Sequence, residues 1–394
     1  MEECDKGIDL LGDELKLENA KIERVKGRIY MRLGDYDMAN EHLEVALHAA
    51  KNFGDKKEIA EIEHNLGTNE WYRGSYDEAL SHLDQALKLR GLIGDKRGES
   101  KTLTNIGIVY DYLGRPDFAL KYYDKSLKSF KKIGDKLNLG MVLNNMGLVY
   151  EKRGEFDKTL EYYTKSLKAM RKVGDKSNIA KAMNNIGNVY QDLGNLEKSL
   201  DYHYESLEIR KEIGDKQGVA SSLVNIGKVL QEKGEFEKSL KNYKESLEIG
   251  KKIGEKYNLI YSYRFIAELK MEQGNFVSAE KNIKKSIDVA KETKSRNEEA
   301  ISRTIFGSIL QGKNEGKEAF NEFKKAEKIF KDTGEKRDYS KLLRKIGQFF
   351  KEKDENEKAL KYLKKAINMQ EELGLDGELE ETKKLLKDVE DTYE

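Results

Sequence analysis

The sequence predicts an all-α protein in which nine helical hairpins stack as a solenoid. Three observations lead to this fold class: a forty-residue internal repeat, apolar residues at helical spacing within each repeat, and a single proline among 394 residues. Proline is the strongest helix breaker, so a chain almost without it can be mostly helical. A regular repeat of this length is typical of stacked helical units, each of which buries its apolar face on its neighbours.

Four positions of the repeat recur without an insertion. One is a column of glycines interrupted by a single alanine: Gly27, Gly67, Gly107, Gly147, Gly187, Gly227, Ala267, Gly307 and Gly347. A second glycine column begins at Gly34, a column of small residues begins at Ala39, and the phrase GDK first occurs at Gly54. Because the four columns keep the same register, nine repeats are predicted over residues 17–376.

Each repeat is predicted to be a pair of helices. In one repeat, apolar residues fall at helical spacing in two runs, which are Leu103, Ile106 and Tyr110, then Ala119, Leu120, Tyr123 and Leu127. Gly114 suits the position just after the first helix, and Pro116 suits the first turn of the second. In the GDK phrase the glycine can end the second helix while Asp135 caps the helix that follows. We interpret the glycines as structural, since no strand precedes them and no Walker lysine follows.

The two ends of the chain differ from the repeats. Residues 4–14, CDKGIDLLGDE, resemble residues 126–136, SLKSFKKIGDK, so residues 1–16 are expected to form part of a second helix. Residues 377–394 carry apolar residues at helical spacing: Leu379, Leu385, Leu386, Val389 and Tyr393. We expect this segment to form a helix that caps the last hairpin, because the terminal unit of a solenoid needs a polar outer face.

Composition narrows the classes of partner. Charged residues make up 37% of the chain but leave a net charge of +1, so no overall field draws it to nucleic acid or to an anionic membrane. The single cysteine, Cys4, cannot form an intramolecular disulfide and fits a reducing cytoplasm. No segment reaches the roughly 18 apolar residues of a membrane helix. We therefore expect a cytoplasmic protein that binds neither nucleic acid nor membrane.

The order of large, small and aromatic residues within a repeat resembles the tetratricopeptide repeat (TPR). The residues that carry the resemblance are Ile106, Gly107, Tyr110, Gly114, Ala119, Tyr123 and Ser126. The likeness covers all nine repeats and is most specific from Gly67 to Gly254. This repeat departs from the commoner TPR in lacking the closing proline and in having a longer GDK turn. In these features it is similar to the LGN/Pins adaptor arrays and, more distantly, to kinesin light chains and prokaryotic TPR proteins. The resemblance implies a right-handed superhelix whose concave groove binds an extended peptide segment of a protein partner.

The sequence contains no recognisable catalytic or metal-binding motif. The patterns HExxH, CxxC, GxSxG and GxGxxG are all missing. His42 and His82 share one register position in successive repeats and are expected on the surface, because metal ligands need a closed set. His203 replaces a tyrosine in a packing column, so we expect it in the core. The sequence therefore predicts no enzyme activity, no metal site and no cofactor.

A column of asparagines occupies the first helix of five successive repeats: Asn65, Asn105, Asn145, Asn185 and Asn225. The family resemblance implies that this face lines the groove and holds a peptide. A carboxamide both donates and accepts, so it can bond to a peptide N–H or C=O whatever the ligand side chain. The alternatives are hydrogen bonding between the helices of neighbouring repeats, or a column that only reflects the history of the repeat. The predicted groove residues are Asn65, Trp71, Lys101, Asn105, Ile108, Asn144, Asn145, Lys181, Asn184, Asn185, Asn188, Asn225, Lys228 and Arg264.

Two features subdivide the predicted groove. Trp71 lies in a column that is otherwise mostly polar, so it is expected to be an exposed aromatic anchor. The alternative is that Trp71 packs against the adjacent repeat. After the fifth asparagine the column continues as Phe265, Ile305 and Lys345, and the neighbouring column becomes basic at Arg264. We therefore expect two segments of groove that differ in chemistry.

These observations predict an adaptor that binds a disordered segment of another protein as an extended peptide. A peptide-sensing regulator resembling the TPR pheromone receptors of bacteria is the first alternative. It would need an output domain, and no DNA-binding helix-turn-helix precedes Gly27. The second alternative is a structural array that assembles with copies of itself through its ends. Fold class alone does not separate these functions, because function lies in the groove.

Overall fold

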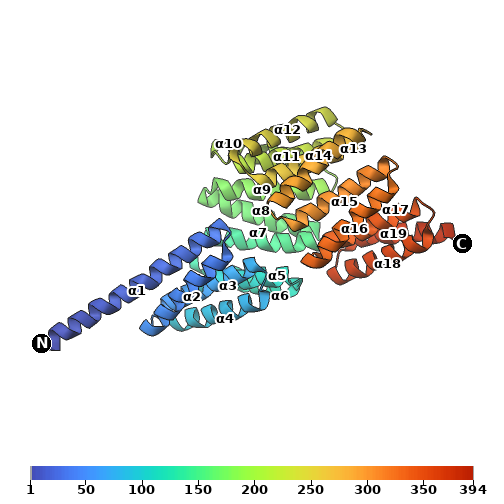
Figure 1. Ribbon diagram of the computed structural model, residues 1–394. Helices are drawn as coiled ribbons and strands as arrows, with labels where there is room; N and C mark the ends of the chain where they lie inside the picture. The colour runs from blue at the N-terminus through green and yellow to red at the C-terminus, as the bar shows by residue number, and fades with distance from the viewer. Residues whose placement is uncertain (1, 394) are drawn as a thin grey trace. The chain divides into compact units, whose positions relative to one another are not determined.

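The computed structural model describes residues 2–393, and their side chains from residue 17 onward except at residues 376 and 393 (Figure 1). It contains 19 α-helices, and the described residues include no strand. The first helices of the nine hairpins are α1 (Glu2–Leu33), α3 (Lys56–Arg73), α5 (Lys96–Tyr112), α7 (Lys136–Lys152), α9 (Lys176–Asp192), α11 (Lys216–Glu232), α13 (Lys256–Glu272), α15 (Arg296–Gly312) and α17 (Lys336–Lys351). The second helices are α2 (Tyr36–Phe53), α4 (Tyr76–Ile93), α6 (Pro116–Ile133), α8 (Phe156–Val173), α10 (Leu196–Glu212), α12 (Phe236–Ile253), α14 (Phe276–Glu292), α16 (Gly316–Thr333) and α18 (Asn356–Leu373), and the last helix is α19 (Asp376–Tyr393).

The chain divides into two compact units. Unit 1 comprises the chain up to Val149 together with Lys168–Val173, and unit 2 comprises Tyr150–Leu167 together with Gly174–Glu394. Within unit 1, α2 packs on α3 and α4 on α5, while within unit 2 the same contact joins α10 to α11, α12 to α13, α14 to α15 and α16 to α17. In all these pairs a second helix packs on the first helix of the next hairpin. This stacking confirms the predicted fold class, an all-α solenoid of helical hairpins.

The first helices also contact one another along the stack. In unit 2 these contacts join α9 to α11, α11 to α13, α13 to α15 and α15 to α17. Side chains at one register position of successive first helices therefore lie in a row. This row is the surface on which a groove can form.

Local sequence signals set the helix ends as predicted. Pro116 begins α6, and Asp135 accepts a hydrogen bond from the Asn138 backbone N–H at 3.1 Å. Gly54 ends α2 with a φ of 77°, in the left-handed region that glycine adopts without strain. These features stop one helix and start the next within two residues.

The glycine column lets the two helices of a hairpin lie close together. A Cβ atom at Gly227 would lie 2.5 Å from Tyr243 Cε1, so only a residue without a side chain fits under this ring. Leu83 is packed on Gly67 in the same way, and His203 on Gly187. His203 is fully buried, which confirms its predicted place in the core.

The two chain ends are helical. α1 is one helix from Glu2 to Leu33, so no turn separates residues 2–16 from the first repeat, and the side chains of residues 2–16 lie outside the described part of the chain. α19 packs against α18 and contacts α17. The division into a partial helix at 1–16, repeats at 17–376 and a cap at 377–394 stays a prediction.

Candidate functional site

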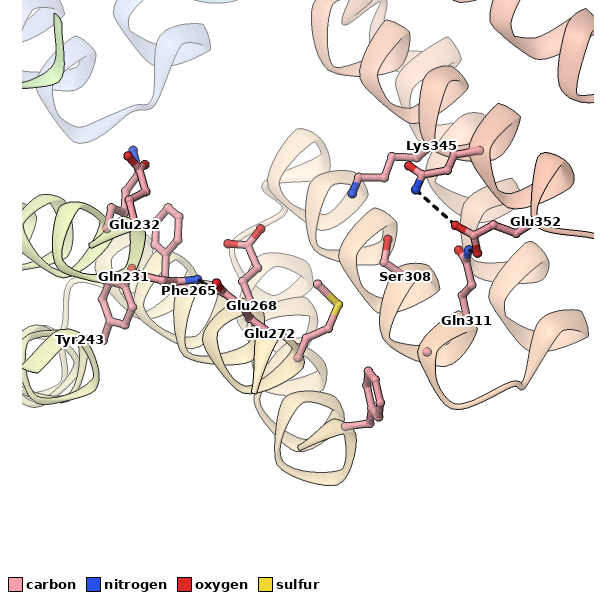
Figure 2. A pocket seen from close by; sticks show the side chains of 15 residues that line it. Gln231, Glu232, Tyr243, Phe265, Glu268, Glu272, Ser308, Gln311, Lys345 and Glu352 are labelled. Atoms are coloured by element: carbon pink, nitrogen blue, oxygen red, sulfur yellow. Dashed lines mark hydrogen bonds between the residues drawn. The ribbon is translucent and has the colours of Figure 1, made fainter. Parts of the chain in front are cut away.

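A groove with a volume of about 730 Å³ lies in unit 2 along four successive first helices, α11, α13, α15 and α17. We call it the α11–α17 groove. Figure 2 shows its two sides, with side chains of α11 and α13 facing those of α15 and α17. The side chains used below are Lys228, Gln231, Glu232, Phe265, Glu268, Met271, Glu272, Phe276, Ser308, Gln311, Gly312, Lys345, Gln348 and Glu352.

The repeat explains why these side chains meet. Lys228, Glu268, Ser308 and Gln348 are forty residues apart and occupy one register position on the four helices. Because the packed first helices hold this position on the same side, the four side chains line up along the groove. The sequence therefore places a cation, an anion, a hydroxyl and an amide in one row.

Bonds between glutamine and glutamate join the first helices along one edge of the groove. Gln231 Nε2 donates to Glu272 Oε2 at 2.6 Å, and Gln311 Nε2 donates to Glu352 in the same way two repeats later. A third such bond joins Gln191 to Glu232. Glutamine is neutral, so this edge of the groove keeps the negative charge of the three carboxylates.

This series is interrupted where Met271 and Gly312 replace glutamine and glutamate. The ring of Phe276 lies over Gly312, and a Cβ atom there would approach Phe276 Cζ to 2.7 Å. Met271 and Phe276 pack against the same apolar cluster. The interruption therefore forms an apolar notch in an otherwise polar edge.

Three charged groups in the groove have no hydrogen bond or ion pair with another residue that the structure describes: Lys228, Glu268 and Lys345. The amino group of Lys228 lies 5.8 Å from the centre of the Phe265 ring. Burial raises the pKa of Glu268, while Arg264, Lys345 and Lys228 act in the opposite direction. These three charged groups line the groove together.

The residues predicted to form the groove all lie on first helices, but in both units. Unit 1 holds Asn65, Trp71, Lys101, Asn105, Ile108, Asn144 and Asn145, and unit 2 holds Lys181, Asn184, Asn185, Asn188, Asn225, Lys228 and Arg264. Of these residues, Lys228 lines the α11–α17 groove. The continuation of the asparagine column also reaches it, since Phe265 and Lys345 line it as well.

Hydrogen bonds between repeats occupy part of the asparagine column. Asn105 Nδ2 donates to Thr68 Oγ1 at 3.0 Å, and Asn225 Nδ2 donates to Asn184 Oδ1 at 2.9 Å. The alternative of bonding between neighbouring helices therefore holds for these two positions. Asn65 Nδ2 is buried and has no partner in the described part of the chain. A role of the column in holding a peptide stays a prediction.

Two other predicted residues have partners within the protein. The Trp71 ring is half-buried and lies 5.2 Å from the Tyr112 ring of the next hairpin, edge to face, so the packing alternative describes its position. Arg264 is buried and forms an ion pair of 2.6 Å with Glu298. The basic character expected at this point of the groove is therefore supplied by Lys228 and Lys345.

Two of the other histidines pair with carboxylates. His42 Nδ1 lies 2.6 Å from Glu23 Oε2, and His82 Nδ1 lies 2.7 Å from Glu63 Oε2, so both are half-buried and not simply exposed. Hydrogen bonding to Glu63 raises the pKa of His82. Among the described residues no three histidine, cysteine, aspartate or glutamate side chains group as they would around a metal ion. None of the described helices combines the length and apolar character of a membrane span.

Sequence comparison identifies the repeats. Models of the tetratricopeptide repeat match residues 18–91, 58–132, 98–172, 138–212, 178–252 and 218–292, and a further one matches residues 342–373. These matches span more than half of the chain. No curated protein sequence matches it.

Several solved structures are similar to this one in fold. A Rap protein complexed with Competence and Sporulation Factor is 13% identical, with 91% of this chain and 99% of that chain covered and a TM-score of 0.62. The quorum sensor NprR from B. thuringiensis is 18% identical, with 90% and 99% covered and a TM-score of 0.59. A STAND protein with a tetratricopeptide repeat sensor from Pyrococcus horikoshii is 17% identical, with 80% and 48% covered and a TM-score of 0.56. At these identities the likeness concerns the fold.

Proposed function

Because the chain belongs to the tetratricopeptide repeat family, we propose that it binds an extended peptide segment of a protein partner in the α11–α17 groove. The observation that carries the proposal is the groove itself, lined by side chains of four successive first helices and containing three charged groups without a partner among the described residues. The proposal is for binding without a catalytic step.

The dimensions of the groove suit an extended chain. Packed helices lie about 8–10 Å apart, and an extended peptide advances about 3.3 Å per residue. The distance from one first helix to the next therefore corresponds to about three ligand residues, and the three intervals between the four helices of the groove correspond to about nine. Lys228 and Lys345 can donate to peptide carbonyl oxygens, while Ser308 and Gln348 can both donate and accept.

The chemistry of the groove favours a cationic ligand with one apolar side chain. Glu232, Glu272 and Glu352 form the charged edge, so basic ligand side chains are expected at intervals of about three residues. The notch formed by Met271 and Phe276 interrupts this edge and suits an apolar side chain. Like charges on an acidic ligand would face the carboxylates and weaken its binding.

The asparagine column extends the proposed binding surface. Asn185 and Asn225 lie on α9 and α11, next to the groove in unit 2, and are proposed to hold the ligand backbone. Asn225 already donates to Asn184, but a carboxamide has a second N–H and an oxygen that accepts. Asn65, Asn105 and Asn145 are proposed to act in the same way within unit 1.

Selection from a library of random 12-residue peptides displayed on phage, followed by calorimetry with the selected peptide, tests the proposal. Ser308→Trp places a large side chain in the groove and is expected to raise Kd about tenfold or more, which corresponds to about 1.4 kcal/mol. Lys281→Trp makes the same type of change on the exposed side of α14 and is the matched control. It is expected to leave Kd unchanged.

Two results would contradict the proposal. One is that calorimetry detects no binding for any of the selected peptides. The other is that Ser308→Trp and Lys281→Trp change Kd equally, which would place the ligand outside the groove. Circular dichroism of both variants checks that each is folded.

A peptide-sensing regulator is the second candidate function. It is favoured by the likeness, over about nine-tenths of both chains, to the quorum sensor NprR and to the Rap protein in complex with Competence and Sporulation Factor. A sensor must change conformation with its ligand, because a ligand with equal affinity for two states shifts neither. Small-angle scattering with and without the selected peptide distinguishes the sensor, whose radius of gyration changes, from a rigid adaptor, whose radius does not.

A further inference from the structure

A second cleft in unit 2 is lined mainly by lysines. It has a volume of about 570 Å³ and lies among α16, α17 and α18, apart from the α11–α17 groove. Seven lysines between Lys317 and Lys365 line it, with only two glutamates, Glu327 and Glu355. We call it the lysine cleft. Its lining carries five positive charges in excess in a chain whose overall net charge is +1.

The two glutamates neutralise only part of this charge. Glu327 accepts from Lys324 at 2.6 Å and lies 2.9 Å from the amino group of Lys331, and Glu355 lies 2.5 Å from that of Lys358. The other four lysines of the cleft form no ion pair with any residue that the structure describes: Lys317, Lys353, Lys361 and Lys365.

The preceding repeat shows how this chain neutralises the same positions elsewhere. There Glu280 lies between two lysines, 2.6 Å from the amino group of Lys284 and 2.8 Å from that of Lys313. Forty residues later the lysines recur as Lys324 and Lys353, but the carboxylate is replaced by Phe320. The lysine cleft thus has no acidic group at the position that Glu280 occupies one repeat earlier.

The N-terminal end of α16 adds a second unfavourable charge arrangement. An acidic second residue complements the positive end of the helix dipole. The equivalent helices of the first six repeats have one: Asp37, Asp77, Asp117, Asp157, Glu197 and Glu237. In α16 the second residue is Lys317, and the amino group of Lys353 lies against Gly316 at the same helix end. Lys317 and Lys353 thus place two positive charges at this helix end, where Glu318 is the acidic residue of the first turn. A bound anion would offset the repulsion.

We propose that the lysine cleft binds an acidic peptide segment, in which several carboxylate side chains are clustered. Its lysines are compact point charges with three donors each, suited to carboxylate oxygens that approach from different directions. A single-stranded nucleic acid is disfavoured, because such ligands stack their bases on open aromatic faces. Phe349 and Phe350 are buried, and the Tyr362 ring is stacked on Phe350 with the amino group of Lys324 5.5 Å from its centre.

Fluorescence anisotropy of the full chain with a fluorescein-labelled octaglutamate peptide tests the inference. Binding is expected at low salt and should weaken as ionic strength rises, because exposed charges are screened. The double variant Lys317→Gln, Lys353→Gln is expected to raise Kd roughly fivefold or more, since each exposed ion pair contributes up to about 1 kcal/mol. Phe320→Glu introduces a carboxylate at the position that Glu280 occupies one repeat earlier, and is expected to weaken binding to a similar extent.

The matched control removes the same charge one repeat earlier. Lys284→Gln with Lys313→Gln should leave Kd within about twofold, because those lysines are already paired with Glu280. Circular dichroism establishes that each variant is folded, and the lysine double variant keeps the test valid if Phe320→Glu is destabilised.

Three results would overturn the inference. The first is no binding of octaglutamate, the second an equal loss in both double lysine variants, and the third tighter binding of a labelled oligouridylate than of octaglutamate. The third would assign the cleft to nucleic acid. None of these results bears on the α11–α17 groove, which is tested separately with its own peptide.

Discussion

Replacing His203 with tyrosine should make the protein more stable. Both ring nitrogens of His203 are buried and have no hydrogen-bond partner among the described residues. Tyrosine occupies the same register position in three other repeats, at Tyr123, Tyr163 and Tyr243. Tyr243 packs on Gly227 as His203 packs on Gly187, and its hydroxyl donates to Gln231 Oε1 at 3.1 Å. Gln191 precedes His203 by twelve residues, as Gln231 precedes Tyr243, so the tyrosine of His203→Tyr can form the same hydrogen bond.

The gain in stability of His203→Tyr comes from removing two buried ring nitrogens that have no hydrogen-bond partner. An unsatisfied buried polar group costs about 1–3 kcal/mol, so the free energy of unfolding should rise by about 1–3 kcal/mol at pH 7 in His203→Tyr. The gain should be larger in acid. Burial, with smaller effects of Lys228 and Arg210, lowers the pKa of His203 to about 3, against an ordinary value of 6.5.

The sign of the pH effect is set by which state takes up the proton. Between pH 6.5 and about 3 the unfolded chain binds a proton at His203 that the folded chain does not, so the native state loses stability as the pH falls through this range. At pH 5 this amounts to about 2 kcal/mol. Tyrosine stays neutral throughout, and the advantage of His203→Tyr should grow to about 3–5 kcal/mol at pH 5.

Urea denaturation followed by circular dichroism at pH 7 and pH 5 measures this difference. Because stability in a solenoid is shared between neighbouring repeats, amide hydrogen exchange in α9 and α10 gives the local value. His64 is a second histidine whose pKa burial lowers to about 3, so a residual acid sensitivity is expected in the variant. An advantage that is absent at pH 7, or that is equal at both pH values, would refute the reasoning.

Two further predictions concern the backbone. Lys294→Gly should raise the free energy of unfolding by about 1 kcal/mol, because Lys294 has a φ of 54° where a side chain is strained; Asn314→Gly should gain less, since asparagine tolerates this region, and equal urea midpoints for Lys294→Gly and the parent would contradict the argument. Gly227→Ala should destabilise the protein by about 1–3 kcal/mol through contact with Tyr243, although alanine is the better helix former. Gly91→Ala in α4 is the control: the new methyl group has open space around it, and the variant should be more stable by about 0.5–1 kcal/mol. Melting temperatures that change in the same direction in both glycine variants would be evidence against the close packing of the hairpin.

The hairpins could be predicted from the sequence because their signals are local and repeated. Pro116 and Asp135 act on the helix end at which they stand, and each position of the glycine column has its packing partner 16 residues away, as Gly227 has Tyr243. Because each of these patterns recurs every forty residues, a pattern that is weak in one repeat becomes clear when the repeats are aligned. The fold therefore follows from residues that interact within one hairpin or with the next.

The position of the groove could not be predicted in the same way. Its shape depends on side-chain size at single repeats, such as Ser308 and Gly312 on α15, and these break the repeat instead of following it. The polar edge depends on bonds such as Gln231 to Glu272, in which residues 41 positions apart meet only after the helices have packed. The packing of Trp71 on Tyr112 has the same origin.

Variation between repeats is not by itself a sign of ligand contact in this protein. The position of Arg90 varies strongly along the chain, and holds arginine again at Arg210, yet both guanidinium groups are buried. Arg90 Nη1 donates to the backbone oxygen of Gly98 at 2.7 Å and to Thr102 Oγ1 at 2.6 Å.

Arg210 donates in the same way to the oxygen of Gly218 at 2.6 Å and to Ser222 Oγ at 2.9 Å. A Cβ atom at Gly218 would lie 2.8 Å from Arg210 Cδ, so the arginine and the glycine eight residues later depend on one another. Such pairs satisfy a buried charge at the contact between one hairpin and the next, which would be costly if it were left unpaired. Variable positions thus also serve the packing between hairpins, and the proposed ligand contacts rest on the place of such positions in the α11–α17 groove.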